Sequence, residues 1–277
     1  MKTIPLPNGE RVPALGQGTW MMGERASARA DEIASLRLGL DLGLTLIDTA
    51  EMYGDGQAES LIGEALAGRR DEAFIVSKVY PHNASAKGAI AACERSLKRL
   101  RTDRIDLYLL HWPGQVPLSE TLAAFRALRE AGKIRHYGVS NFDLAQLQDW
   151  WALDSEQGLA ANQLLYNLTR RGIEWDLLPW MHERRIPLMA YSPIEQARLI
   201  GDRRLIDLAR DLGHSPAQLA LAWLLAREDT IALPKTGQGK HMRENAAAAS
   251  IVLDCGQLGR LDALFAPPGG HVPLEML

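Results

Sequence analysis

The chain has 277 residues, a length that suits one large barrel or two small domains. Hydrophobic residues make up 47% of it and charged residues 23%, so the chain can bury a sizeable core and is not disordered. The formal net charge of −3 gives no general attraction for nucleic acid or for an anionic membrane, and neither is expected as a partner.

A short hairpin is predicted at the start of the chain, with strands at residues 2–6 and 11–12. Its turn, Pro7-Asn8-Gly9, contains Asn-Gly, which is the strongest short-range hairpin signal. Eight short apolar strands then alternate with amphipathic helices. These strands are predicted at residues 14–18, 45–48, 74–78, 105–111, 137–141, 161–165, 188–192 and 230–235.

The segments between the strands carry the period of a helix. Leu118, Leu122, Phe125 and Leu128 fall on one face, and the string Ser215-Pro216-Ala217-Gln218 is a helix start signal. Strands that alternate with helices are parallel, because each helix carries the chain back across the sheet. Eight such units predict an α/β fold, a single (β/α)₈ TIM barrel over residues 1–277, with an open doubly wound sheet as the alternative.

Polar side chains stand at or near the ends of the seven predicted strands from 45–48 onward, where a parallel barrel collects them at one mouth. They are Asp48, Lys78, His111, Ser140, Asn141, Gln163, Tyr191, Ser192, Lys235 and Thr236. Singly, each has an ordinary explanation: Asp48 could cap a helix, Lys78 could reach solvent, and His111 could be a hydrogen-bonded core imidazole. Together they place an acid, a base and an imidazole on neighbouring strands, which favours an active site.

The spacing also predicts a proton donor. Asp48 and Lys78 can form an ion pair, and Tyr53 lies five residues past Asp48, within reach of that pair. A lysine about 4 Å away, at an effective dielectric near 20, favours the phenolate by roughly 4 kcal/mol before desolvation. We therefore expect a lowered pKa for Tyr53, which would act as a general acid, with neutral His111 orienting a carbonyl oxygen.

A general acid of this kind needs a nucleophile for the carbonyl carbon. No activated serine or cysteine is evident. The strings at residues 16–18 and 54–59 each lack the third glycine of the dinucleotide-binding fingerprint and are read as turns. A hydride from a nicotinamide bound in another way is the natural alternative.

At this point the sequence resembles the aldo-keto reductase family, as a bacterial member with short loops. The strings that carry the resemblance are Leu-Ile-Asp-Thr-Ala (46–50), Val-Ser-Lys (76–78), Leu-Leu-His-Trp-Pro (109–113) and Gly-Val-Ser-Asn-Phe (138–142). Asp48, Tyr53, Lys78 and His111 match the catalytic tetrad of that family. The resemblance implies a barrel closed at its bottom by the hairpin, with an extended cofactor across its top.

The resemblance also implies cofactor contacts. Ser140, Asn141 and Gln163 match residues that bind the nicotinamide carboxamide, and Tyr191 matches the aromatic residue that stacks on its ring. Further contacts are implied at Gly18, Thr19, Trp20 and Asp48, and at Ser192 and Pro193 for the pyrophosphate. Lys235 and Thr236 match the pair that meets the 2′-phosphate, so NADPH is expected rather than NADH. His241 stands where many relatives have arginine, and it shares one helix face with Glu244 and Asn245. Because the arginine is missing, we expect weaker binding of the 2′-phosphate, so NADH remains an alternative cofactor.

The walls of the substrate pocket are expected at Trp20, Met21, Met52, Tyr80 and Trp112, with plain core packing as the alternative for Tyr80 and Trp112. Because the segment after His111 and the tail after Pro273 are short, we expect an open site for small aldehydes or 2-oxoaldehydes. Two other functions stay open: a Schiff-base lyase that uses Lys78, and a nucleotide-binding module that reports redox state. A monomer is the common form in the family.

The lack of targeting features and the small number of cysteines predict that the protein is located in the reducing cytoplasm. Residues 1–16 lack the apolar run of a signal peptide, and no uncharged apolar stretch of about 18 residues could span a membrane. The two cysteines, Cys93 and Cys255, form neither a disulfide framework nor a metal-ligand cluster, so no metal is expected. Cys93 shares an apolar stripe with Ile90 and Leu97, which favours a buried thiol.

Overall fold

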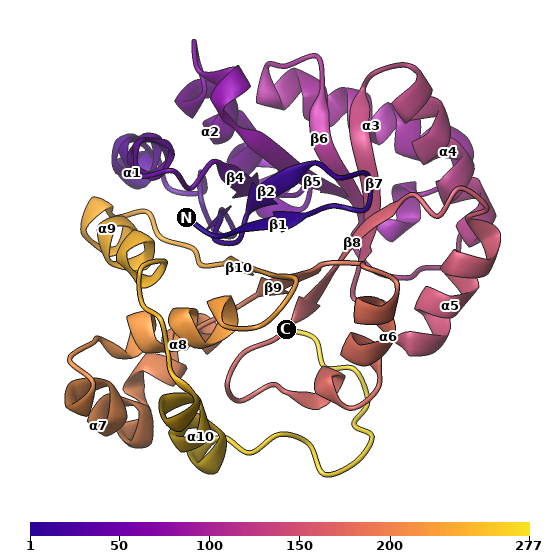
Figure 1. Cartoon of the computed structure of the whole chain (residues 1–277). Helices are drawn as coiled ribbons and strands as arrows, with labels where there is room; N and C mark the ends of the chain where they lie inside the picture. The colour runs from indigo at the N-terminus through magenta and orange to yellow at the C-terminus, as the bar shows by residue number, and fades with distance from the viewer.

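The computed structural model describes residues 1–277, and eight parallel strands form the centre of the molecule (Figure 1). They are β3 (Gln17–Gly18), β4 (Leu46–Asp48), β5 (Phe74–Val79), β6 (Ile105–Leu110), β7 (Ile134–Ser140), β8 (Leu159–Leu165), β9 (Leu188–Tyr191) and β10 (Thr230–Leu233). Each strand pairs with the next in chain order. Parallel bridges from Leu15 to Ala232 and from Gly18 to Lys235 join the first strand to the last. The predicted barrel is confirmed, and the open sheet is excluded.

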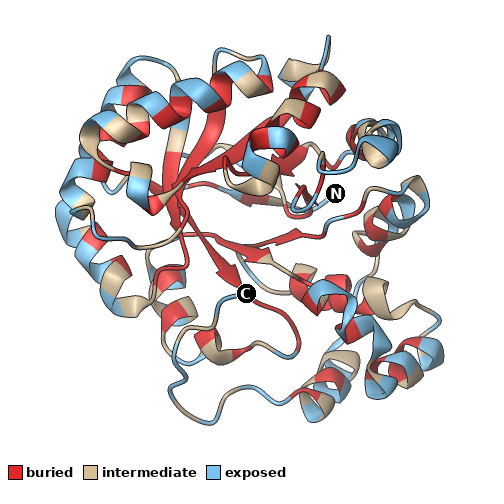
Figure 2. Cartoon of the chain, turned by 180° about the vertical axis from the view of Figure 1, so that it is seen from behind, coloured by how far each residue is buried: buried red, intermediate tan, exposed pale blue.

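Ten α-helices surround the strands. They are α1 (Arg29–Asp41), α2 (Gln57–Ala65), α3 (Ala86–Leu100), α4 (Leu118–Glu130), α5 (Leu144–Leu153), α6 (Leu177–Glu183), α7 (Arg203–Asp211), α8 (Pro216–Leu225), α9 (Gly239–Ala248) and α10 (Cys255–Leu264). Figure 2 shows the strands buried and the outer faces of the helices exposed. None of the helices is both long and apolar enough to cross a membrane.

The sequence signals for individual helices are confirmed. Leu122, Phe125 and Leu128 of α4 are buried, as the apolar face predicts. Ser215 accepts the backbone N–H of Gln218 at the start of α8, and the Gln218 side chain accepts the Ser215 N–H, which completes a capping box. Cys93 is fully buried in α3, and burial raises the pKa of its thiol to about 12.

The hairpin of β1 (Thr3–Pro5) and β2 (Arg11–Pro13) closes the amino end of the barrel. Its turn is the predicted Pro7-Asn8-Gly9, and Gly9 has the positive φ of 88° that favours glycine. The buried residues of the hairpin share one apolar cluster with the barrel interior: Ile4, Leu6 and Val12 pack with Leu46, Phe74, Leu107, Met189 and Ile231. The functional mouth therefore lies at the carboxyl ends of the strands.

Candidate active site

A buried ion pair lies at the carboxyl ends of β4 and β5. The Nζ atom of Lys78 lies 2.8 and 3.0 Å from the two carboxylate oxygens of Asp48 and donates to the Thr49 carbonyl at 2.7 Å. The same nitrogen lies 3.3 Å from the hydroxyl of Tyr53. Lys78 is fully buried and Asp48 is 3% exposed, so water contributes almost nothing to their solvation. The structure thus brings together three of the four residues predicted as catalytic.

The loop after β4 turns Tyr53 back over this pair. A short 3₁₀ turn runs through Tyr53–Gly56, and Gly54 and Gly56 take positive φ angles of 56° and 86°. Glycine adopts this left-handed region without a steric penalty, so the glycines allow the chain to reverse within four residues. This turn lies in one of the two Gly-containing strings, residues 54–59, that the sequence predicts to be turns.

His111, the fourth residue, lies directly after β6 beside the phenol. Its ring centroid lies 6.0 Å from that of Tyr53 in an edge-on arrangement, and its backbone carbonyl accepts from Asn141 Nδ2 at 3.0 Å. The Nδ1 atom is buried and has no hydrogen-bond partner. Burial, with the positive charge of Lys78 adding, lowers the pKa of His111 to about 2. The imidazole is therefore neutral at ordinary pH.

The expected lowering of the Tyr53 pKa is wrong. Burial raises this pKa well above its ordinary value, and the negative charge of Asp48 raises it further. The physical reason is that Asp48 lies against Lys78 and offsets its charge, while the phenolate would lose its hydration. Burial also lowers the pKa of Lys78, against the opposing effect of Asp48. Tyr53 is a phenol, not a phenolate, at working pH.

Residues predicted to bind the carboxamide form one hydrogen-bond network with the ion pair. Gln163 Nε2 donates to Asp48 Oδ1 at 2.7 Å, and the hydroxyl of Ser140 donates to the Gln163 carbonyl at 2.9 Å. The hydroxyl of Tyr191 donates to Asn141 Oδ1 at 2.9 Å. Asn141 has a positive φ of 59°, which asparagine tolerates better than most residues. The polar ends of β7, β8 and β9 thus meet at one place.

The residues predicted for the rest of the cofactor lie on the closing strands and on α9. Gly18 is bridged to Lys235, and the buried Thr19 hydroxyl donates to the Asp48 carbonyl at 2.8 Å. Lys235 is exposed and Thr236 is buried. In α9, His241 is exposed and Asn245 is buried, while the Glu244 carboxylate accepts the Ser215 hydroxyl. Ser192 and Pro193 follow β9, where Ser192 has a positive φ of 48°.

A row of aromatic rings extends from the phenol along one side of the mouth. His111 lies 4.8 Å from Trp112, and Trp112 lies edge-on at 5.8 Å from Tyr80, measured between ring centroids. Tyr80 and Trp112 are both partly exposed, so they are not core residues. The other predicted wall residues are Trp20 and Met21, which are 41% and 50% exposed, and the half-buried Met52.

The last residues of the chain fold back to this mouth. Arg170 pairs with Glu275 of the tail at 2.5 Å and with Glu195, in the loop after β9, at 2.9 Å. Burial raises the pKa of Tyr191 to about 12, and the Leu277 backbone lies close enough to that hydroxyl to oppose part of the rise. Figure 1 places the C-terminus beside β8 and β9. The short tail therefore lies against this side of the mouth.

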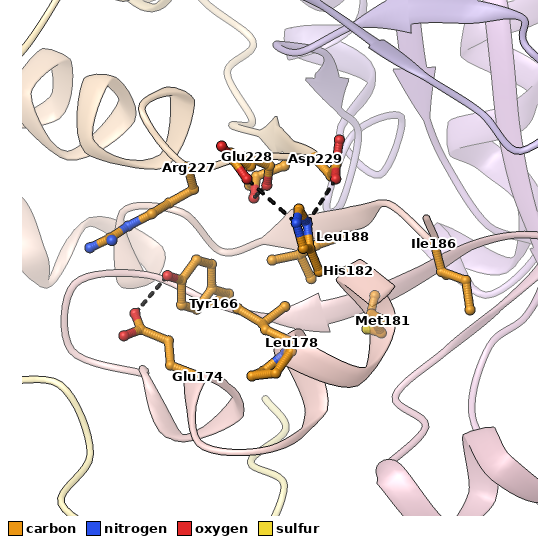
Figure 3. A pocket seen from close by; sticks show the side chains of 12 residues that line it. Tyr166, Glu174, Leu178, Met181, His182, Ile186, Leu188, Arg227, Glu228 and Asp229 are labelled. Carbon is orange, nitrogen blue, oxygen red and sulfur yellow. Dashed lines mark hydrogen bonds and ion pairs between the residues drawn. The ribbon is translucent and has the colours of Figure 1, made fainter. Parts of the chain in front are cut away.

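A second hollow, of about 280 Å³, lies on the outside of the barrel near the first residues of β9 and β10 (Figure 3). His182 lies 3.1 Å from Asp229 and the Tyr166 hydroxyl donates to Glu174 at 2.6 Å, while two buried guanidinium nitrogens of Arg227, another lining residue, have no hydrogen-bond partner. None of the residues predicted for the site lines it. The mouth with the buried ion pair remains the candidate active site.

One buried acid of the mouth was not singled out from the sequence. Glu51 lies between Asp48 and Tyr53, is 7% exposed, and accepts the backbone N–H of Tyr80 at 2.8 Å. The available signal was its position among the four residues that separate two predicted catalytic residues, Asp48 and Tyr53.

The carboxyl end of this barrel, where (β/α)₈ enzymes hold their active sites, thus carries a phenol, a lysine–aspartate pair and a neutral imidazole. A model of the Aldo/keto reductase family matches residues 14–266. Methylglyoxal reductase YeaE of Escherichia coli (strain K12) is 48% identical over 281 residues, covering 100% of this chain and 99% of that protein. Glyoxal reductase of Bacillus subtilis (strain 168) is 31% identical, covering 95% and 92%.

Solved structures agree with these matches. An aldo/keto reductase from Klebsiella pneumoniae in complex with NADP and acetate superposes with a TM-score of 0.97 and 47% identity, covering 100% of this chain and 99% of its own. A structure of the same description with NADPH gives the same values. The chain belongs to the aldo/keto reductase family. It is an NAD(P)H-dependent oxidoreductase of that family.

Proposed function

We propose that this protein reduces small aldehydes and 2-oxoaldehydes to alcohols with NADPH, and that Tyr53 is the proton donor. The observation that carries the proposal is the position of Lys78 Nζ, 2.8 Å from Asp48 and 3.3 Å from the Tyr53 hydroxyl. The names of two relatives, a methylglyoxal reductase and a glyoxal reductase, favour 2-oxoaldehydes as substrates. The direct test is oxidation of NADPH in the presence of methylglyoxal or phenylglyoxal, followed by absorbance.

The donor set of the mouth fits a nicotinamide dinucleotide. Ser140, Asn141 and Gln163 offer the hydroxyl and amides that a carboxamide needs, and Tyr191 offers a flat ring. Lys235, with Thr236 beside it, offers a free cation for a phosphate. When bound, NADPH supplies the hydride that the carbonyl carbon receives.

The side chains of the mouth handle the oxygen and the proton. His111, as a neutral imidazole, orients the carbonyl oxygen, and Tyr53 donates its proton to that oxygen as negative charge builds on it. The transfer is downhill because a phenol is a stronger acid than an alcohol. Lys78 then stabilises the phenolate, and Asp48 holds the ammonium group in place.

The rate of reduction should be nearly constant over the ordinary pH range. Tyr53 must be protonated to act as an acid. Because its pKa is raised, the hydroxyl loses its proton only at higher pH than an ordinary tyrosine does. His111 stays neutral because its pKa is lowered to about 2. We therefore expect kcat/KM for reduction to change less than about twofold between roughly pH 6 and pH 8 in a buffer of fixed ionic strength, with a fall at higher pH where Lys78, whose pKa is lowered by burial, loses its charge. A fall centred near neutral pH would contradict this.

The preference for NADPH should depend on Lys235. A charge-assisted hydrogen bond from this lysine to the 2′-phosphate predicts that Lys235→Met raises the Kd of NADPH about 10-fold to 100-fold. NADH lacks that phosphate, so its Kd should change less than about twofold. Kd values come from titration of tryptophan fluorescence. Lys87→Met, another exposed lysine, is the matched control, and equal losses for both cofactors would contradict the assignment.

The alternative functions have less support. A Schiff base on Lys78 needs a free amine, but its nitrogen donates to Asp48 and Thr49. A redox-reporting module does not require a phenol held against that amine.

The proposal also includes a monomer in a reducing cytoplasm, which the free thiols of Cys93 and Cys255 fit. Size-exclusion chromatography with light scattering tests the monomer.

A further inference from the structure

Glu51 is a buried carboxylate that the proposed mechanism does not use. It lies in the loop between Asp48 and Tyr53 and is 7% exposed. The only cation paired with it is Arg95, at 3.6 Å, and that side chain is about half exposed. A buried charge with such weak ionic compensation must gain its stability from hydrogen bonds.

Those hydrogen bonds lead to the wall of the substrate pocket. Glu51 Oε1 accepts the backbone N–H of Tyr80 at 2.8 Å and the side-chain amide of Asn83 at 3.0 Å. Tyr80 is the residue that precedes the 3₁₀ turn Pro81–Asn83, so the carboxylate holds this turn at both ends. The backbone N–H of Glu51 also donates to the Lys78 carbonyl at 3.3 Å. One residue thus joins the loop of Tyr53 to the loop of Tyr80.

The ring that Glu51 positions belongs to the aromatic row beside the phenol. Tyr80 lies 5.8 Å from Trp112, which lies 4.8 Å from His111, and His111 lies 6.0 Å from Tyr53, all between ring centroids. The far end of a substrate whose carbonyl reaches Tyr53 and His111 would lie along this row. The distance between the proton donor and Tyr80 would then determine which substrates fit.

We propose that Glu51 is a positioning residue that determines specificity, because its carboxylate fixes Tyr80 relative to Tyr53. This inference rests on the proposed reduction by Tyr53. It predicts that Glu51 matters for substrates that extend to Tyr80, such as an aryl 2-oxoaldehyde, and has little effect on a short one.

Two substitutions separate positioning from folding. Glu51→Ala removes the oxygen that accepts both hydrogen bonds, and we expect the KM of phenylglyoxal to rise about 10-fold while the KM of methylglyoxal changes less than about twofold. Glu51→Gln keeps an Oε1 acceptor and should restore the wild-type KM for phenylglyoxal. In a Tyr80→Ala background, Glu51→Ala should have no further effect on that KM. Glu120→Ala is the matched control, because that exposed carboxylate accepts only the nearby Ala86 N–H at 3.2 Å.

Hydrogen exchange at the Tyr80 amide tests the link without activity. We expect protection in the wild type and in Glu51→Gln, and faster exchange in Glu51→Ala. Equal rises in KM for both aldehydes, a failure of Glu51→Gln to restore the phenylglyoxal KM, or an unprotected Tyr80 amide in the wild type would overturn the inference. A wild-type protein that oxidises no NADPH but shows the expected exchange pattern would overturn the proposed reduction and leave the Glu51–Tyr80 link supported.

Discussion

Replacing Tyr53 by phenylalanine is expected to lower kcat/KM for the reduction of methylglyoxal by about 10²–10⁴-fold. The substitution removes only the hydroxyl, which lies 3.3 Å from Lys78 Nζ, and leaves the ring beside His111. The proton that the carbonyl oxygen requires would then have to come from water. Steady-state oxidation of NADPH at saturating cofactor measures the loss.

A second tyrosine provides the control for this substitution. The hydroxyl of Tyr108 is buried without a hydrogen-bond partner, so Tyr108→Phe should leave kcat/KM unchanged and should not lower stability. The Kd of NADPH in Tyr53→Phe should stay within about twofold of the wild type, which would show that the cofactor still binds. A Tyr53→Phe protein with nearly full activity would refute the assignment of the proton donor.

The free energy of unfolding is expected to fall by about 3–5 kcal/mol when Lys78 is replaced by methionine. The substitution leaves the buried carboxylate of Asp48 without its cation, and only Gln163 Nε2 still donates to it from a side chain. Urea unfolding followed by circular dichroism measures the change. The loss should be accompanied by loss of reduction, since the phenolate would have no neighbouring cation.

The double substitution Asp48→Asn with Lys78→Met shows whether an unpaired charge is the cause. It should recover most of the lost stability, because neither charge is then buried alone. Lys133→Met is the matched control, since Lys133 pairs with Glu94 at the surface and should cost less than about 1 kcal/mol. If Lys78→Met and Lys133→Met cost the same, the buried pair would not carry the stability assigned to it.

Most of the barrel could be predicted because its strands are short, apolar and separated by amphipathic helices. The errors lie at strand ends and have local causes. β7 begins at Ile134, three residues before its predicted start, because Arg135 and His136 interrupt the apolar pattern while pairing with Glu10. β10 ends at Leu233 because Pro234 has no N–H to donate to the ladder.

Site residues that stand at the ends of strands could be predicted from the sequence. Properties that depend on contacts between residues distant in sequence could not. Asp48 and Lys78 follow from strand order, since adjacent parallel strands bring their ends together. The pKa of Tyr53 did not follow, because it depends on how completely Asp48 offsets Lys78 and on how much water reaches the phenol. Positive φ angles occur at Glu195, Gln196 and Ala197, none of which is glycine, so the sequence gives no signal for this turn. The Glu195 carboxylate is held by side chains that are distant in sequence.

The end of the described chain beside Tyr191 has a practical consequence for handling the protein. An affinity tag or fusion partner joined to Leu277 would start at the rim of the site, next to the residues proposed to bind the nicotinamide. Met1 is exposed and precedes the hairpin at the opposite end of the barrel. A tag at the amino end is therefore placed away from the mouth, whereas one joined to Leu277 is placed against it.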